Sequence, residues 1–225
     1  MIRSHWAVAA LLQLLLGLSL AGALHGCAGR VVDDNDPASL LADAEDEIKS
    51  DHFQLAVDKL KEVKNKFPYS KFSIDAQLRL ADVYFMQESY ADAAAQYETF
   101  RDLHPKHEKV GYAMFRIAKS YYNDAPTTIE RDMTPAKKAL DAYTEFLHRF
   151  PASTDLPEAN KDVADLRGRV AQKELIIADF YFKREFYSSA KPRYQKIVDQ
   201  FADTPSVERA KSQLAKLDQL ATNAK

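Results

Sequence analysis

Four segments of the chain repeat one pattern of apolar side chains, and this repetition limits the possible folds more than any other feature. Five positions in each segment lie 3, 4, 3 and 4 residues apart, which is the spacing of one apolar face on an α-helix. The second position is always alanine and the third always carries a larger side chain, so a neighbouring helix can approach closely there. The sets are Phe53, Ala56, Leu60, Val63 and Phe67; Tyr90, Ala93, Tyr97, Phe100 and His104; Ala136, Ala139, Tyr143, Phe146 and Phe150; and Tyr187, Ala190, Tyr194, Ile197 and Phe201.

A second helical pattern precedes each of these segments, and a stop signal follows most of them. Proline follows Phe67, His104 and Phe150, and proline cannot continue a helix. We therefore expect the four helices to end near residues 67, 104, 150 and 201. The preceding helices share an apolar-alanine pair and a tyrosine: Leu80-Ala81 with Tyr84, Ile117-Ala118 with Tyr121, and Ile177-Ala178 with Tyr181, whereas the first copy has Ala44 and Glu47.

The first two copies lie 37 residues apart, close to the roughly 34 residues of tetratricopeptide repeats. Residues 123–134 are interpreted as an insertion inside the third unit, and residues 157–183 as a lengthened first helix of the fourth. A last helix over residues 205–221 would close the array. The pattern predicts an all-α fold over residues 37–221, with tetratricopeptide-like hairpins stacked into a right-handed solenoid of about five repeats. A compact helix bundle is the alternative.

Three of the expected helix starts combine a capping side chain with a proline at the first helical position. Asp36, Thr134 and Thr204 each precede a proline, and such side chains can accept hydrogen bonds from the free amides of the first turn. Pro192 falls near the end of the first turn of another helix, where we expect a local distortion.

Composition excludes several classes of protein. The formal net charge is −2, so nothing favours nucleic acid as a partner. One cysteine, Cys27, can form neither an internal disulfide nor a cysteine-based zinc site. Only Gly111 and Gly168 follow the first thirty residues. Sharp turns with positive φ and phosphate-binding loops both draw on glycine, so nucleotide-binding and hairpin-rich β folds are not expected.

The first residues are interpreted as an export signal. Arg3 precedes an apolar run over residues 6–24, which is typical of a secretory signal, although a membrane-spanning anchor is the alternative. The run ends in Leu24-His25-Gly26-Cys27, which resembles a bacterial lipobox apart from His25. We expect a signal peptide over residues 1–26 and a lipidated Cys27 with a tether over residues 27–36. The resemblance to lipoproteins implies that Ala28 directs the chain to the outer membrane, facing the periplasm.

The sequence contains few residues in catalytic or metal-binding patterns. His104 and His107 lie three residues apart, but at a predicted helix end, where a turn between repeats explains them better than a metal site. Neither a His-Glu-x-x-His helix nor a Gly-x-Ser-x-Gly turn is present. The acidic clusters fit a solvated tether and helix N-termini. The sequence therefore predicts no catalytic residue, no metal, no cofactor beyond the lipid on Cys27, and no small-molecule substrate.

Several strings resemble the BamD family, the tetratricopeptide lipoproteins of the outer-membrane β-barrel assembly machinery. They are Lys64-Asn65-Lys66-Phe67-Pro68-Tyr69-Ser70, residues 76–84, Phe100-Arg101-Asp102-Leu103-His104-Pro105, Arg131-Asp132, Arg149-Phe150-Pro151-Ala152-Ser153, Leu166-Arg167-Gly168-Arg169-Val170-Ala171, and Tyr181-Phe182-Lys183-Arg184. The resemblance covers residues 30–220 and includes the ends of both insertions, which a generic repeat protein would not match.

The resemblance implies a scaffold that is not an enzyme. Such proteins dock on the periplasmic domains of the barrel-forming subunit BamA through their C-terminal repeats. They also receive unfolded β-barrel precursors, in which the N-terminal groove is implicated. Arg193 stands where the family has a docking arginine, although a solvated helix arginine is the alternative, and Arg131 and Asp132 are further candidate partner-binding residues. The competing functions are a pilotin or secretin-assembly lipoprotein, a coordinator of cell-wall synthesis and, least supported, a hydrolase.

Overall fold

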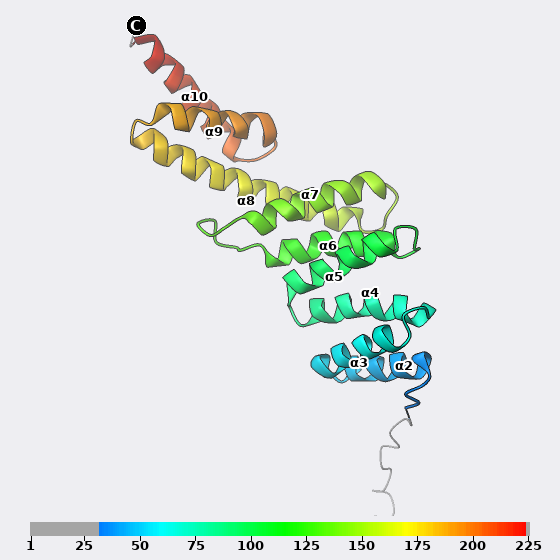
Figure 1. The fold of residues 1–225 in the computed structure, drawn as a ribbon. Coiled ribbons are helices and arrows are strands. Elements are labelled where there is room, and N and C mark those ends of the chain that lie inside the picture. The colour runs from blue at the N-terminus through cyan, green and yellow to red at the C-terminus, as the bar shows by residue number, and fades with distance from the viewer. Residues whose placement is uncertain (1–31, 224–225) are drawn as a thin grey trace, which may run out of the picture.

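The computed structural model describes residues 32–223, and all regular secondary structure among them is helical. The helices follow one another along an elongated array (Figure 1). In chain order they are α2 (Pro37–Lys49), α3 (Phe53–Lys66), α4 (Lys71–Met86), α5 (Tyr90–Leu103), α6 (Val110–Asp124), α7 (Thr134–Arg149), α8 (Leu156–Lys183), α9 (Tyr187–Gln200) and α10 (Ser206–Asn223).

These helices form four hairpins, α2–α3, α4–α5, α6–α7 and α8–α9, with α10 packed after the last. Each helix contacts chiefly the helices before and after it in sequence, and some first helices also touch the first helix of the next hairpin. The predicted all-α repeat fold is confirmed. Of the fifth repeat, the described residues contain one helix, α10.

The repeated apolar positions form the core between the hairpins. The alanine at the second position is fully buried in all four segments, as is the larger side chain at the third. The fifth position has a separate role, because Phe67, His104, Phe150 and Phe201 are each the C-cap of a second helix, with φ between −127° and −130°. The five repeated positions therefore mark both the buried face of each second helix and the residue at which that helix ends.

The turns inside three hairpins differ from the expectation that positive φ would need glycine. Asp51, Glu88 and Glu185 have φ of 58°, 59° and 61°. Each follows a first helix, and the next residue donates its amide to a carbonyl five residues back, as His52 does to Glu47. This is the Schellman arrangement, in which glycine is usual. Three acidic residues therefore occupy a conformation that disfavours side chains with a Cβ.

One predicted cap is confirmed, one is wrong, and one hydroxyl has another role. The Asp36 carboxylate accepts hydrogen bonds from the amides of Ala38 and Ser39 and caps α2. Thr134 does not cap α7, because the helix begins at Thr134 itself. The Thr204 hydroxyl donates to the Phe201 carbonyl in the preceding turn. Helix α9 continues through Pro192 without a break.

Candidate docking site

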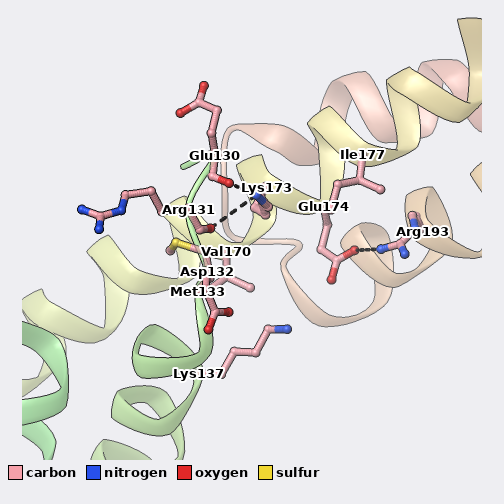
Figure 2. A pocket seen from close by; sticks show the side chains of 10 residues that line it. All are labelled: Glu130, Arg131, Asp132, Met133, Lys137, Val170, Lys173, Glu174, Ile177 and Arg193. Atoms are coloured by element: carbon pink, nitrogen blue, oxygen red, sulfur yellow. Dashed lines mark hydrogen bonds and ion pairs between the residues drawn. The ribbon is translucent and has the colours of Figure 1, made fainter. Parts of the chain in front are cut away.

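A pocket of about 330 Å³ lies where the third and fourth hairpins meet. Two walls enclose it: the side chains of α8 and α9 form the first, and residues 130–133, just before α7, form the second (Figure 2). Four cationic and three acidic residues contribute to a lining made of Glu130, Arg131, Asp132, Met133, Lys137, Val170, Lys173, Glu174, Ile177 and Arg193. The sequence candidates Arg193, Arg131 and Asp132 therefore share one site, although the chain separates Arg193 from the other two by about sixty residues.

Glu174 forms the centre of the first wall. Its side chain is 9% exposed, and its two oxygens accept from Arg193 Nη1 at 2.7 Å and Lys196 Nζ at 2.8 Å. Burial alone would raise the pKa of Glu174, but the hydrogen bonds and charges of Lys196 and Arg193 outweigh it and lower that pKa. Two cations share one carboxylate here, so this wall keeps a surplus positive charge.

Arg193 is thus more than a solvated helix arginine. Its side chain is 37% exposed and is fixed by the Glu174 carboxylate from α8. Its guanidinium carbon also lies 5.8 Å from the centre of the Tyr181 ring. The remaining exposed part of the guanidinium faces the pocket, where it can donate to a partner.

The second wall belongs to the insertion between α6 and α7. Lys173 Nζ donates to the carbonyls of Glu130 at 2.9 Å and Arg131 at 3.4 Å. The Arg131 guanidinium itself extends away from Glu174 (Figure 2). Asp132 Oδ1 accepts from the amide of Thr134 at 3.0 Å and from its hydroxyl at 2.8 Å. Those hydrogen bonds from Thr134 lower the pKa of Asp132. The Asp132 carboxylate is thus bound to the first residue of α7.

Among residues 32–223, no carboxylate forms a salt bridge with Arg131, Lys137 or Lys173. With four cations against three carboxylates in its lining, the pocket keeps a net positive charge. Such a site can bind carboxylate groups, because guanidinium and ammonium groups form charge-assisted hydrogen bonds with carboxylates.

Sequence reasoning missed Lys137, Lys173, Glu174 and Lys196, and a signal existed for one of them. Glu174 lies three and four residues before Ile177 and Ala178, on the apolar face of its helix. An acidic residue on such a face predicts a buried carboxylate that needs a cationic partner. Cys27 and the proposed signal lie outside the described residues.

The described part of the chain holds no group of three or more His, Cys, Asp or Glu side chains arranged to bind a metal. None of its helices is long and apolar enough to cross a membrane.

Comparison with known families decides the relationship. The family model YfiO, described as outer membrane lipoprotein, matches residues 33–224. The chain belongs to this family. A relative in Neisseria meningitidis serogroup A, named outer membrane protein assembly factor BamD, is 29% identical over 88% of this chain and 80% of its own length. A relative of the same name in Vibrio cholerae is 28% identical, covering 88% and 87%. These matches confirm the resemblance to BamD.

Among solved structures, a tetratricopeptide repeat protein from Parabacteroides merdae aligns with a TM-score of 0.42 and 15% identity. The alignment covers 81% of this chain and 60% of that one.

Proposed function

We propose that the chain is a lipid-anchored periplasmic scaffold that helps assemble β-barrel proteins in the outer membrane. It works by binding and positioning its partners, without a chemical step of its own. Its family is one of outer membrane lipoproteins, and relatives that cover most of its length are named assembly factors. Lipid on Cys27 would hold the array at the membrane, as lipobox-like residues 24–27 suggest.

The observation that carries the proposal is one cation-rich pocket that residues 130–133 and Arg193 line together. We assign this pocket to docking of the periplasmic domains of BamA through an acidic segment. Lys137 and Lys173 add two further positive charges that form no salt bridge within residues 32–223, so association would be fast and sensitive to salt. Arg193 is partly ordered by Glu174 before the partner arrives, which lowers the entropic cost of binding.

A second surface, on α4 and α6, is suited to the other proposed partner, an unfolded barrel precursor. The Arg116 guanidinium carbon lies 3.6 Å from the centre of the Phe85 ring, and Tyr112 beside it is 40% exposed. Barrel strands carry many apolar and aromatic side chains on their lipid-facing side. A surface that combines a stacked guanidinium with exposed aromatic rings can bind such segments without demanding one sequence.

Site-specific photo-crosslinking in living cells tests both assignments. A photoreactive residue at Arg131 should capture BamA, and one at Tyr112 should capture barrel precursors. Lys106, exposed in the turn between α5 and α6, is the matched control and should capture neither. Capture of a secretin at position 131, with no BamA, would reject the assembly role and favour a pilotin.

A binding measurement with purified components tests the charge argument. Arg193→Ala should weaken binding of the BamA periplasmic domains by about tenfold or more, because removing one partner of a charge-assisted contact costs on the order of 1.5–3 kcal/mol. Lys211→Ala on α10, whose side chain is exposed and does not line the pocket, should leave the affinity unchanged.

A further inference from the structure

The segment over residues 125–133 forms one wall of the pocket, yet it has little structure of its own. It lies between the end of α6 and the start of α7, and Ala125 and Met133 at its two ends are buried. Between these ends, Thr127, Thr128, Glu130, Arg131 and Asp132 are exposed. The one backbone hydrogen bond within the segment runs from the Arg131 amide to the Thr128 carbonyl at 3.2 Å.

Two cations of α8 hold this segment by its carbonyl groups. Arg169 Nη2 donates to the carbonyls of Pro126 at 2.6 Å and Ala125 at 3.4 Å. Lys173 Nζ donates to those of Glu130 and Arg131. Arg169 and Lys173 lie four residues apart on one helix and therefore project from the same face, one turn from each other. Arg169 therefore binds the beginning of the segment, and Lys173 binds its end.

The two cations are held differently. Arg169 is oriented by Asp165, at 3.1 Å from its Nη1, and it does not line the pocket. Lys173 forms no salt bridge among the described residues and lines the pocket itself. Because unpaired carbonyl groups are strong acceptors, both contacts replace the internal hydrogen bonds that a regular element would have supplied.

We propose that Arg169 and Lys173 are positioning residues, which fasten residues 125–133 to α8 and so set residues 130–133 opposite Arg193 across the docking pocket. The effect on docking rests on the proposed function, whereas the attachment of residues 125–133 to α8 does not. Without the two cations, the segment would keep its buried ends and lose the position of its centre. The pocket would then have one fixed wall and one mobile wall, and part of the binding free energy would be spent on ordering the second.

The experiment uses the full chain in detergent and compares Arg169→Met, Lys173→Met and Lys173→Arg. Lys161→Met, an exposed lysine on the same helix, is the matched control. One readout is the rate of tryptic cleavage after Arg131 in the folded protein, which reports local opening of the segment. The other is the affinity for purified BamA periplasmic domains. The melting temperature confirms that each variant remains folded.

Arg169→Met and Lys173→Met should each raise the cleavage rate by about tenfold or more and weaken binding by about three- to tenfold. Lys173→Arg should restore both values, and Lys161→Met should change neither. Arg169→Met is the decisive variant, because Arg169 does not line the docking pocket, whereas Lys173 does.

The possible failures are distinguishable. If cleavage after Arg131 does not change in Arg169→Met or Lys173→Met, the segment is not held by these cations and the proposal is overturned. If cleavage accelerates while affinity is kept, and Arg193→Ala still weakens binding, docking stands but positioning is rejected. If Arg193→Ala, Arg131→Ala and Arg169→Met all bind normally, the docking site itself is wrong and the positioning role falls with it.

Discussion

Three second helices carry a buried tyrosine whose hydroxyl donates to an aspartate on a first helix. Tyr97 donates to Asp82 at 2.6 Å, Tyr143 to Asp162 at 2.6 Å, and Tyr194 to Asp179 at 2.7 Å. Burial and then the adjacent carboxylate raise the pKa of Tyr143, so its hydroxyl remains a donor at neutral pH. The ring fills the core while the hydroxyl fixes the spacing of two helices.

Loss of one such hydroxyl should therefore destabilise the array. Tyr143→Phe leaves Asp162, which is 4% exposed, with Lys119 as its remaining partner. We expect a loss of about 1.5–3 kcal/mol, the usual range for a hydrogen bond to a charged group, measured by urea unfolding. Tyr84→Phe is the control, since no hydrogen bond of the Tyr84 hydroxyl is found among the described residues, and it should change stability by no more than about 0.5 kcal/mol.

Glu174 makes the stability of the fourth hairpin depend on pH. Its pKa lies below the ordinary value of 4.5 in the folded chain, so its stabilising contribution is present above about pH 4.5 and is lost as pH falls through the folded value. Glu174→Gln should cost about 1–2 kcal/mol at pH 7, a reduced figure because Arg193 and Lys196 are 37% exposed. Urea unfolding should show this deficit shrinking below about pH 4.5; a deficit that stays constant down to pH 3 would contradict the assignment.

Glu88 offers a test of the left-handed turns. With φ of 59° it bears a cost that glycine avoids, so Glu88→Gly should stabilise the chain by about 0.5–1 kcal/mol. Glu88→Ala keeps the Cβ and should give no such gain. Thermal unfolding compares the two variants, and equal melting temperatures would show that the conformation carries no penalty.

At the scale of the helices, the sequence predicts the residue range of each helix well and the side chains that cap it less well. The 3-and-4 spacing follows directly from the geometry of an α-helix, which is why α8 was expected over residues 157–183 and is observed over Leu156–Lys183. A cap depends on which of several nearby side chains reaches the free amides. Beside α7 that side chain belongs to Asp132, two residues before the threonine that the sequence suggested.

The tyrosine–aspartate pairs could have been predicted in part. Asp82 follows Leu80-Ala81, and Asp179 follows Ile177-Ala178. In the third unit, Lys119 occupies that position and instead binds Asp162 of α8 at 2.6 Å. The pocket could not be predicted to the same degree, because the path of residues 125–133 depends on hydrogen bonds from α8 that no periodic pattern records.

The two glycines of the repeat region should respond in opposite ways to alanine. A Cβ at Gly168 in α8 meets nothing within 4 Å, whereas one at Gly111 in α6 would lie 3.0 Å from the Phe150 ring. Gly168→Ala should gain about 0.5–1 kcal/mol from helix propensity, and Gly111→Ala should lose about 1–2 kcal/mol by crowding. Urea unfolding of the pair checks this; a loss of stability in Gly168→Ala would show that the added methyl group is not accommodated there.

For the whole molecule, folding and membrane attachment should be separable. Cys27 precedes α2 by ten residues, and the core of the array lies within residues 40–217. Cys27→Ala should therefore move the protein from the membrane fraction to the soluble fraction without changing its melting temperature. Retention of the variant on membranes washed with high salt would show that something other than lipid on Cys27 holds it there.

The contacts of each helix with its sequence neighbours also bear on how the chain reaches its native state. Most contacts between helices join helices that are adjacent in sequence, so folding needs few contacts between distant parts of the chain, which form slowly. A polypeptide that emerges N-terminus first could build the α2–α3 pair and extend it stepwise, before the residues of α10 have arrived. Because each helix contacts mainly its sequence neighbours, a helix that packs wrongly late in the chain need not disrupt the hairpins already formed.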